Sequence, residues 1–229
     1  MGTLFIVATP IGNLEDITLR ALRVLKEADV VYCEDTRVSM KLFDKYGIAA
    51  KLKRLDAHKE GEKVQEVVSR LAEGERVAYI TDAGTPGISD PGARLVGAVR
   101  RALGDSFPIV PIPGPSALTA ALSVAGVPAD SFLFLGFLPH KKGRQTLLKD
   151  IAEEERAVVL YESPHRILKL LRELGEHIGN REVVVLRELT KKFENVQVGD
   201  PKGIAEYLEE YKQDKGEFVV VIAPQGKRR

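Results

Sequence analysis

The feature that most constrains the fold is a series of short, continuously apolar runs rich in β-branched residues. These runs cover residues 4–8, 30–33, 77–80, 109–112, 132–136, 158–161, 183–186 and 218–222. A strand with one solvated face alternates apolar and polar residues, whereas a strand covered on both faces stays apolar throughout. The runs therefore predict buried strands and favour parallel βαβ connections.

Between several of these runs, apolar residues recur at the i, i+3, i+4, i+7 spacing of an amphipathic helix. Three such stripes are Leu14, Ile17, Ala21, Leu22 and Leu25; Val64, Val67, Val68 and Leu71; and Ile167, Leu170, Leu171 and Leu174. Stripes of this kind pack against a core. They predict an α/β protein and carry no chemistry of their own.

The chain of 229 residues is long enough for one large domain or two small ones. Strand and helix patterns alternate up to Ile112, where the proline-rich stretch PIPGPS begins to interrupt them. We expect an N-terminal α/β domain over residues 1–113 and a C-terminal one over residues 114–229. The second domain ends with an alternating strand at 194–199 and a longer one at 218–222, so its sheet should be mixed.

Composition excludes several classes of protein. The 34 basic and 33 acidic residues give a net charge of +1, so any RNA contact must come from local clusters. Cys33 is the only cysteine, which excludes an internal disulfide and multi-cysteine metal motifs and fits a reducing compartment. The first apolar run is too short for a signal peptide or a membrane span. We expect a cytoplasmic protein with no metal site and no membrane contact.

Ligands of open α/β sheets bind beyond the carboxyl ends of the strands, which directs attention to the loops there. The first is TPIGN at residues 9–13, where Gly12 is the only glycine. A dinucleotide fingerprint needs two further glycines, so a nicotinamide cofactor is disfavoured. The loop is either a close backbone approach to a ligand or a plain strand-to-helix turn.

The second loop, EDTR, places Glu34, Asp35 and Arg37 directly after a strand. A carboxylate there can accept a substrate proton, and a guanidinium can clamp a phosphate or carboxylate. The alternative is structural: a helix N-cap combined with a surface ion pair between Asp35 and Arg37.

The third loop, DAGTPGISDPG at residues 82–92, holds three glycines and two prolines. Most connections in α/β units need about two to six residues. A loop this long and this restricted predicts a backbone shaped around a ligand, with Ser89 or Asp90 as a helix cap before Pro91. A fourth loop, PGPSA at residues 113–117, is a second rigid turn before a helix.

Together with ESPHR at residues 162–166 and RELTK at residues 187–191, these loops form an ordered series of six motifs. The series resembles the bacterial ribosomal RNA small-subunit methyltransferase I family of the tetrapyrrole methylase superfamily. The resemblance implies a two-domain tetrapyrrole-methylase-like α/β fold with the active site in the interdomain cleft, and a homodimer. It also implies methyl transfer from S-adenosylmethionine to the ribose 2′-hydroxyl of a cytidine in the decoding region of small-subunit RNA.

The resemblance also assigns cofactor contacts to positions that match the family's motifs. They are Pro10, Gly12, Asp82, Gly84, Thr85, Ile88, Ser116, Ala117, Tyr161 and Leu189. The partner it implies is small-subunit ribosomal RNA, either free or in the 30S particle.

The implied reaction needs a group that removes a weakly acidic proton from the attacking hydroxyl. Glu34, Asp35 and His58 are the candidates, with the Glu34–Asp35 pair favoured and Arg37 assigned to an adjacent phosphate. His58 is equally explained as a surface loop residue.

RNA contacts are expected from basic residues in local clusters, which are alternatively explained as solvated faces or helix starts. The candidates are Lys141, Lys142, Arg144, His165, Arg166 and Lys191.

Two other functions remain open from the sequence. One is a methyltransferase of the same superfamily that acts on a small tetrapyrrole-type molecule. The other is a non-catalytic RNA-binding or ribosome assembly factor that has kept the fold, which the cofactor loops disfavour because a pure binder has no use for them.

Overall fold

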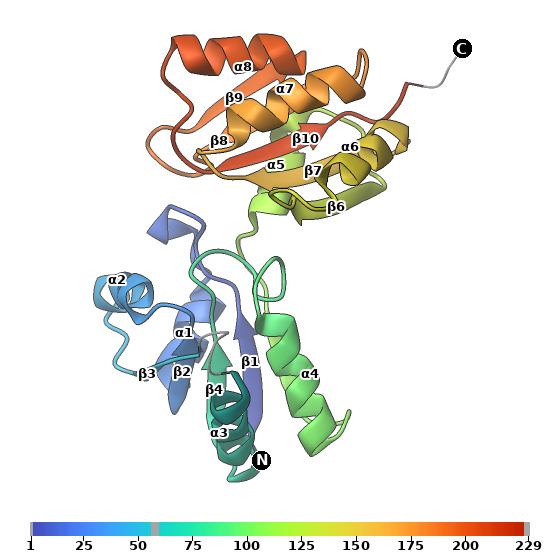
Figure 1. Ribbon diagram of the computed structural model, residues 1–229. Helices are drawn as coiled ribbons and strands as arrows, with labels where there is room; N and C mark the ends of the chain where they lie inside the picture. The colour runs from blue at the N-terminus through green and yellow to red at the C-terminus, as the bar shows by residue number, and fades with distance from the viewer. Residues whose placement is uncertain (1, 56–59, 227–229) are drawn as a thin grey trace. The chain divides into compact units, whose positions relative to one another are not determined.

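The computed structural model describes residues 2–55 and 60–226, which form two compact units (Figure 1). Unit 1 ends at Ser116 and unit 2 begins at Ala117, within the PGPSA motif. His58, a predicted catalytic candidate, lies outside the described residues. No helix in the described part of the chain is both long and apolar enough to cross a membrane.

Unit 1 is built on a five-stranded sheet in which every pair of strands is parallel, in the order β3-β2-β4-β1-β5. Its strands are β1 (Thr3–Val7), β2 (Val30–Cys33), β3 (Lys51–Arg54), β4 (Arg76–Tyr79) and β5 (Ile109–Ile112). Its helices are η1 (Leu14–Asp16), α1 (Leu19–Glu27), α2 (Thr36–Tyr46), α3 (Glu60–Ala72) and α4 (Gly92–Leu103). The predicted parallel N-terminal sheet is confirmed, and all five carboxyl ends lie along one edge.

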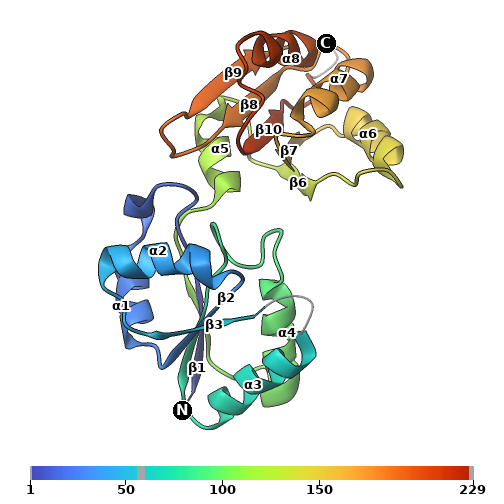
Figure 2. The same ribbon diagram turned by 60° about the vertical axis from the view of Figure 1, so that its left-hand side comes forward.

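The uninterrupted apolar runs follow from helices that cover both faces of this sheet (Figure 2). In β2, Val31 and Cys33 pack into the apolar cluster with α1 and α2. Val30 and Tyr32 face the other way, into the cluster with α3 and α4. Each residue of β2 is therefore buried whichever way it points, and the strand has no solvated face for a polar residue.

Strand β3 was not predicted because Lys51–Arg54 has no apolar run. It lies at one side of the sheet and pairs only with β2, and none of its residues is fully buried. Charged residues are common on such edge strands because they discourage pairing with another chain.

Unit 2 holds a second five-stranded sheet in the order β6-β7-β10-β8-β9. Its strands are β6 (Phe132–Phe137), β7 (Ala157–Glu162), β8 (Val183–Arg187), β9 (Asn195–Gly199) and β10 (Phe218–Ile222). Strands β6 and β7 are parallel, whereas β10 runs antiparallel to β7 and β8, and β9 runs antiparallel to β8. The predicted mixed sheet is confirmed, and the carboxyl ends of β6, β7 and β8 share one edge.

Helices cover both faces of the second sheet as well (Figure 1). One face packs against α6 (Arg144–Glu153), α7 (Ile167–His177) and α8 (Pro201–Glu210). The other face packs against α5 (Ala117–Ala125).

Two ion pairs with little solvent exposure fix the helical layer to the segment that follows β6. Arg144 is 3% exposed, and its Nη2 lies 2.6 Å from Oε2 of Glu173 in α7. Arg166 lies 2.7 Å from Oε1 of Glu162 at the end of β7. Both guanidiniums also donate to the backbone, Arg144 to the Pro139 carbonyl at 3.2 Å and Arg166 to the Leu138 carbonyl at 2.9 Å.

The Arg144→Ala substitution should lower the free energy of unfolding by about 3 kcal/mol, because it leaves the Glu173 carboxylate without its buried partner. Guanidinium denaturation of the two proteins would measure the loss. Arg172→Ala is the matched control, since its pair with Glu209 is more than half exposed on both sides and should contribute at most about 1 kcal/mol. Equal losses in the two variants would contradict the structural role of Arg144.

Candidate functional site

In unit 1, the loop that follows the central strand β4 is bonded to the loops that follow three other strands. Thr9 and Gly84 exchange two backbone hydrogen bonds, of 2.9 and 3.1 Å, and so join the loops after β1 and β4. Thr85 Oγ1 donates to the Pro115 carbonyl at 3.0 Å, which joins the loop after β5. The Asp35 N–H donates to Asp82 Oδ1 at 3.0 Å, which joins the loop after β2. The predicted ligand-binding loops of unit 1 thus form one connected surface.

The backbone conformation of the loop at residues 82–92 is set by Gly84 and by the carboxylate of Asp90. Gly84 has φ +86°, and a Cβ added there would lie 3.3 Å from Ile11 Cγ2, so only glycine fits without a shift. The carboxylate of Asp90 accepts the N–H groups of Gly87, Ile88 and Gly92 at distances of 2.7 to 3.0 Å. The N-cap of α4 is Pro91, which has no side-chain cap bond, so the prediction that Ser89 or Asp90 caps a helix beginning at Pro91 is wrong. Asp90 nevertheless accepts the N–H of Gly92, the first residue of the helix.

In the EDTR motif, Asp35 and Arg37 adopt the structural alternative. Asp35 is the N-cap of α2 and accepts the Arg37 N–H at 2.8 Å. The Arg37 guanidinium also pairs with this carboxylate, at 2.5 Å between Nη2 and Oδ2. The side-chain hydrogen bond from Arg37, followed by the backbone one, holds the pKa of Asp35 far below its usual range. A carboxylate so stabilised in its charged form is a weak proton acceptor.

Glu34 has the opposite electrostatic environment. Partial burial, followed by the negative charges of Asp82 and Asp90, raises the pKa of its carboxyl. Tyr79 in β4 is fully buried nearby, and its hydroxyl has no hydrogen-bond partner among the described residues. Burial and then the charge of Glu34 raise the pKa of Tyr79, so this hydroxyl stays neutral. Sequence reasoning missed Tyr79 because it reads as one more apolar strand residue.

The predicted cofactor residues fall into two groups. Seven lie in the connected loops of unit 1, and these are Pro10, Gly12, Asp82, Gly84, Thr85, Ile88 and Ser116. Three belong to unit 2: Ala117 begins α5, Tyr161 is the last residue but one of β7, and Leu189 follows β8. Leu189 is flanked by Glu188 and Thr190, which both have left-handed φ values, of 53° and 66°. Such conformations cost free energy and often mark ligand sites.

The predicted RNA-binding residues differ in whether their side chains are held in ion pairs. Lys141, Lys142 and His165 are exposed. Arg144 and Arg166 are held in the ion pairs described above. Lys191 lies 2.8 Å from carboxylate oxygens of both Glu188 and Glu217. Arg144, Arg166 and Lys191 therefore have carboxylate partners inside unit 2. RNA contact stays a prediction for all six residues.

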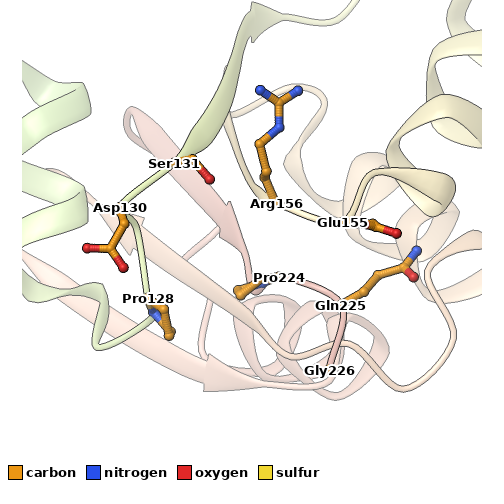
Figure 3. Close-up of a pocket in the computed structure, with 8 residues that line it drawn as sticks. All are labelled: Pro128, Asp130, Ser131, Glu155, Arg156, Pro224, Gln225 and Gly226. Atoms are coloured by element: carbon orange, nitrogen blue, oxygen red, sulfur yellow. The ribbon is translucent and has the colours of Figure 1, made fainter. Parts of the chain in front are cut away.

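A pocket of about 610 Å³ lies in unit 2, where β6 and β7 begin and β10 ends (Figure 3). It is lined by Pro128, Asp130, Ser131, Glu155, Arg156, Pro224, Gln225 and Gly226. None of the predicted site residues is among them. The pocket opens at the end of the sheet opposite to Tyr161 and Arg187, and we assign it no role.

Comparison with known proteins gives a consistent result. The family model for Tetrapyrrole (Corrin/Porphyrin) Methylases matches residues 3–205. A Pseudomonas aeruginosa protein named Ribosomal RNA small subunit methyltransferase I is 47% identical over 225 residues, which cover 97% of this chain and 79% of that protein. A Thermotoga maritima protein of the same name is 44% identical over 223 residues, covering 97% of this chain and 99% of that protein.

Among solved structures, a uroporphyrin-III-C-methyltransferase from Thermus thermophilus superposes with a TM-score of 0.67. It is 22% identical, and the match covers 97% of this chain and 94% of that one. At this level of identity the likeness concerns the fold alone.

Asp82→Asn should lower the pKa of Glu34 towards the ordinary glutamate value of about 4.3, because it removes a nearby negative charge. The amide keeps an oxygen that can accept the Asp35 N–H. The measurement is an NMR titration of the Glu34 side-chain carboxyl carbon. Asp105→Asn, an exposed change just beyond α4, is the control and should leave the titration unchanged. An unaltered Glu34 titration in Asp82→Asn would show that Asp82 does not act on Glu34.

Proposed function

The chain belongs to the ribosomal RNA small-subunit methyltransferase I family of the tetrapyrrole methylases, and from this we propose that it methylates the ribose 2′-hydroxyl of a cytidine in the decoding region. The strongest support is sequence identity: three relatives named Ribosomal RNA small subunit methyltransferase I are 44–47% identical over 96–97% of the chain. The resemblance predicted from the six motifs is confirmed. The chain is accordingly a methyltransferase of small-subunit ribosomal RNA that uses S-adenosylmethionine.

The loops of unit 1 suit this cofactor. When bound, S-adenosylmethionine supplies an electrophilic methyl group on a positively charged sulfur. We propose that the backbone at Gly12 and Gly84 and the exposed carboxylate of Asp82 contact the cofactor. The hydrogen bonds among Thr9, Gly84, Thr85 and Pro115 hold these groups in place before a ligand arrives, which lowers the entropic cost of binding. We propose Tyr161 and Leu189 as further contacts from unit 2.

Glu34 is the residue we propose as general base. Its carboxylate would accept the proton of the ribose hydroxyl as that oxygen attacks the methyl group that a bound S-adenosylmethionine would supply. The raised pKa of Glu34 makes it the better acceptor, because a base is most effective when its pKa approaches the working pH. Asp35 is assigned instead to holding the start of α2 and the Arg37 guanidinium, which is free to approach a phosphate on its exposed side.

Labelled methyl transfer to small ribosomal subunits that lack the modification, followed by mapping of the methylated nucleotide, tests the function. We expect label at one ribose of a decoding-region cytidine. A parallel reaction with naked RNA would show whether the 30S particle or free RNA is the substrate. Light scattering of the same preparation would test the proposed homodimer. No incorporation into either substrate would contradict the function.

Glu34→Gln should reduce methyl transfer roughly 100-fold or more while leaving the affinity for S-adenosylmethionine unchanged, because only proton removal is lost. Asp35→Asn is the matched control: it keeps an acceptor for the Arg37 N–H and should retain most of the wild-type rate. In the wild type, kcat/KM should rise with pH through the pKa of Glu34, because the protonated carboxyl cannot accept a proton. Single-turnover rates over a pH series would measure methyl transfer and its pH dependence. Isothermal titration would measure the affinity for S-adenosylmethionine. A wild-type rate in Glu34→Gln would exclude this residue as the base.

The two alternative functions make different predictions. A small-molecule methyltransferase is supported by the match to the tetrapyrrole methylase family model and by the fold shared with the uroporphyrin methyltransferase. It would transfer label to a tetrapyrrole and not to RNA. A non-catalytic assembly factor would gain no thermal stability from S-adenosylmethionine, whereas either enzyme would.

A further inference from the structure

The last residue of β6, Phe137, exposes an aromatic ring at the edge of the sheet of unit 2. It is 54% exposed, although burial of a phenylalanine is strongly favourable. The Tyr161 ring packs edge-on against it, with 5.7 Å between centroids and 63° between planes. Tyr161 is itself packed edge-on against Phe134, at 4.9 Å and 69°. The Phe137 ring is thus supported by other rings and still open to solvent.

The segment that follows Phe137 is held in a fixed position at its start. The carbonyls of Leu138 and Pro139 accept hydrogen bonds from the guanidiniums of Arg166, which is mostly buried, and Arg144, which is buried. The other end turns into α6 through Gly143, which has φ +82°. A loop ordered before binding loses little conformational entropy when a ligand arrives.

Positive charge lies between these two fixed ends. Lys141 and Lys142 are exposed, and neither forms an ion pair with any residue that the structure describes. By contrast, Arg144, Arg166 and Lys191 are all held in ion pairs. The loop therefore combines one open aromatic ring with two uncompensated ammonium groups a few residues away.

We propose that Phe137 stacks on an unpaired base of the RNA substrate, while Lys141 and Lys142 hold adjacent phosphates. Unpaired bases are recognised by stacking on aromatic side chains, and lysines neutralise the backbone. An apolar protein partner would not need the lysines, and a purely electrostatic contact would not need an open ring. The inference rests on the proposed function, because it identifies where unit 2 contacts that RNA. Arg144 and Arg166 then act as positioning residues for the loop and not as RNA contacts.

The test of stacking uses Phe137→Leu and Phe137→Trp in the full chain, with RNA affinity measured by filter binding to the small-subunit RNA or particle that the wild type methylates. Leucine keeps the apolar bulk but removes the ring, so binding should weaken roughly fivefold to a hundredfold. Tryptophan keeps a ring and should bind like the wild type. Affinity for S-adenosylmethionine should be the same in all of them. Val124→Ala is the control, since Val124 is also exposed, at 57%. It lies near the end of α5, just before β6 begins, whereas Phe137 lies where β6 ends.

The lysines are tested separately through the salt dependence of binding. Lys141→Gln with Lys142→Gln should weaken binding and reduce the slope of log affinity against log salt by about 2, or about 1 for each phosphate contact. Phe137→Leu should weaken binding without changing this slope. Lys149→Gln, an exposed change within α6, is the matched control and should leave both quantities unchanged.

Several outcomes would overturn the inference. Wild-type RNA affinity in Phe137→Leu would exclude stacking while leaving the methyltransferase function intact. Loss of S-adenosylmethionine affinity in that variant would assign the ring to the cofactor, and a changed oligomeric state by light scattering would assign it to an interface between copies of the chain. A wild-type protein that transfers no methyl group to RNA would overturn the proposed function itself, and this inference with it.

Discussion

The pair of backbone hydrogen bonds between Thr9 and Gly84 is the constraint on which the site in unit 1 depends. It joins the loops after two neighbouring strands, β1 and β4, at the edge where all five strands end. Once Gly84 is held there, Thr85 reaches the Pro115 carbonyl and Asp82 reaches the backbone of Asp35. A side chain at residue 84 would disturb this arrangement twice, through its positive φ and through contact with Ile11. The glycine-rich loop therefore organises the neighbouring loops, and the proposed cofactor site depends on that arrangement.

This arrangement also separates the properties of two adjacent carboxylates. Asp35 is tied to Arg37, which stabilises its charged form, whereas Glu34 is partly buried near Asp82 and Asp90, which destabilises the charged form. The difference arises from partners 47 or more residues away in sequence as well as from a local turn. Two acids that look interchangeable in the motif EDTR are therefore suited to different tasks.

The sequence predicted those parts of the structure that depend on patterns within a segment. Buried strands followed from apolar runs such as Val30–Cys33, and the mixed sheet followed from the alternating pattern around residues 194–199. Strand β3 was missed because its residues are charged, and only its pairing with β2 defines it. Asp35 and Glu34 could not be told apart, and the pairing of Arg144 with Glu173 could not be foreseen, because each depends on tertiary contacts that no local pattern encodes.

The paired arginines of unit 2 connect the packing of this unit with the RNA contact that we propose for the loop after β6. The same guanidiniums that join α6 and α7 to the sheet also hold the backbone of Leu138 and Pro139. A substitution at Glu173, whose side chain is 14% exposed and paired with Arg144, would therefore loosen the loop that Arg144 holds. Selection on thermal stability and selection on substrate recognition would act on the same few residues here, so drift in one property cannot proceed independently of the other.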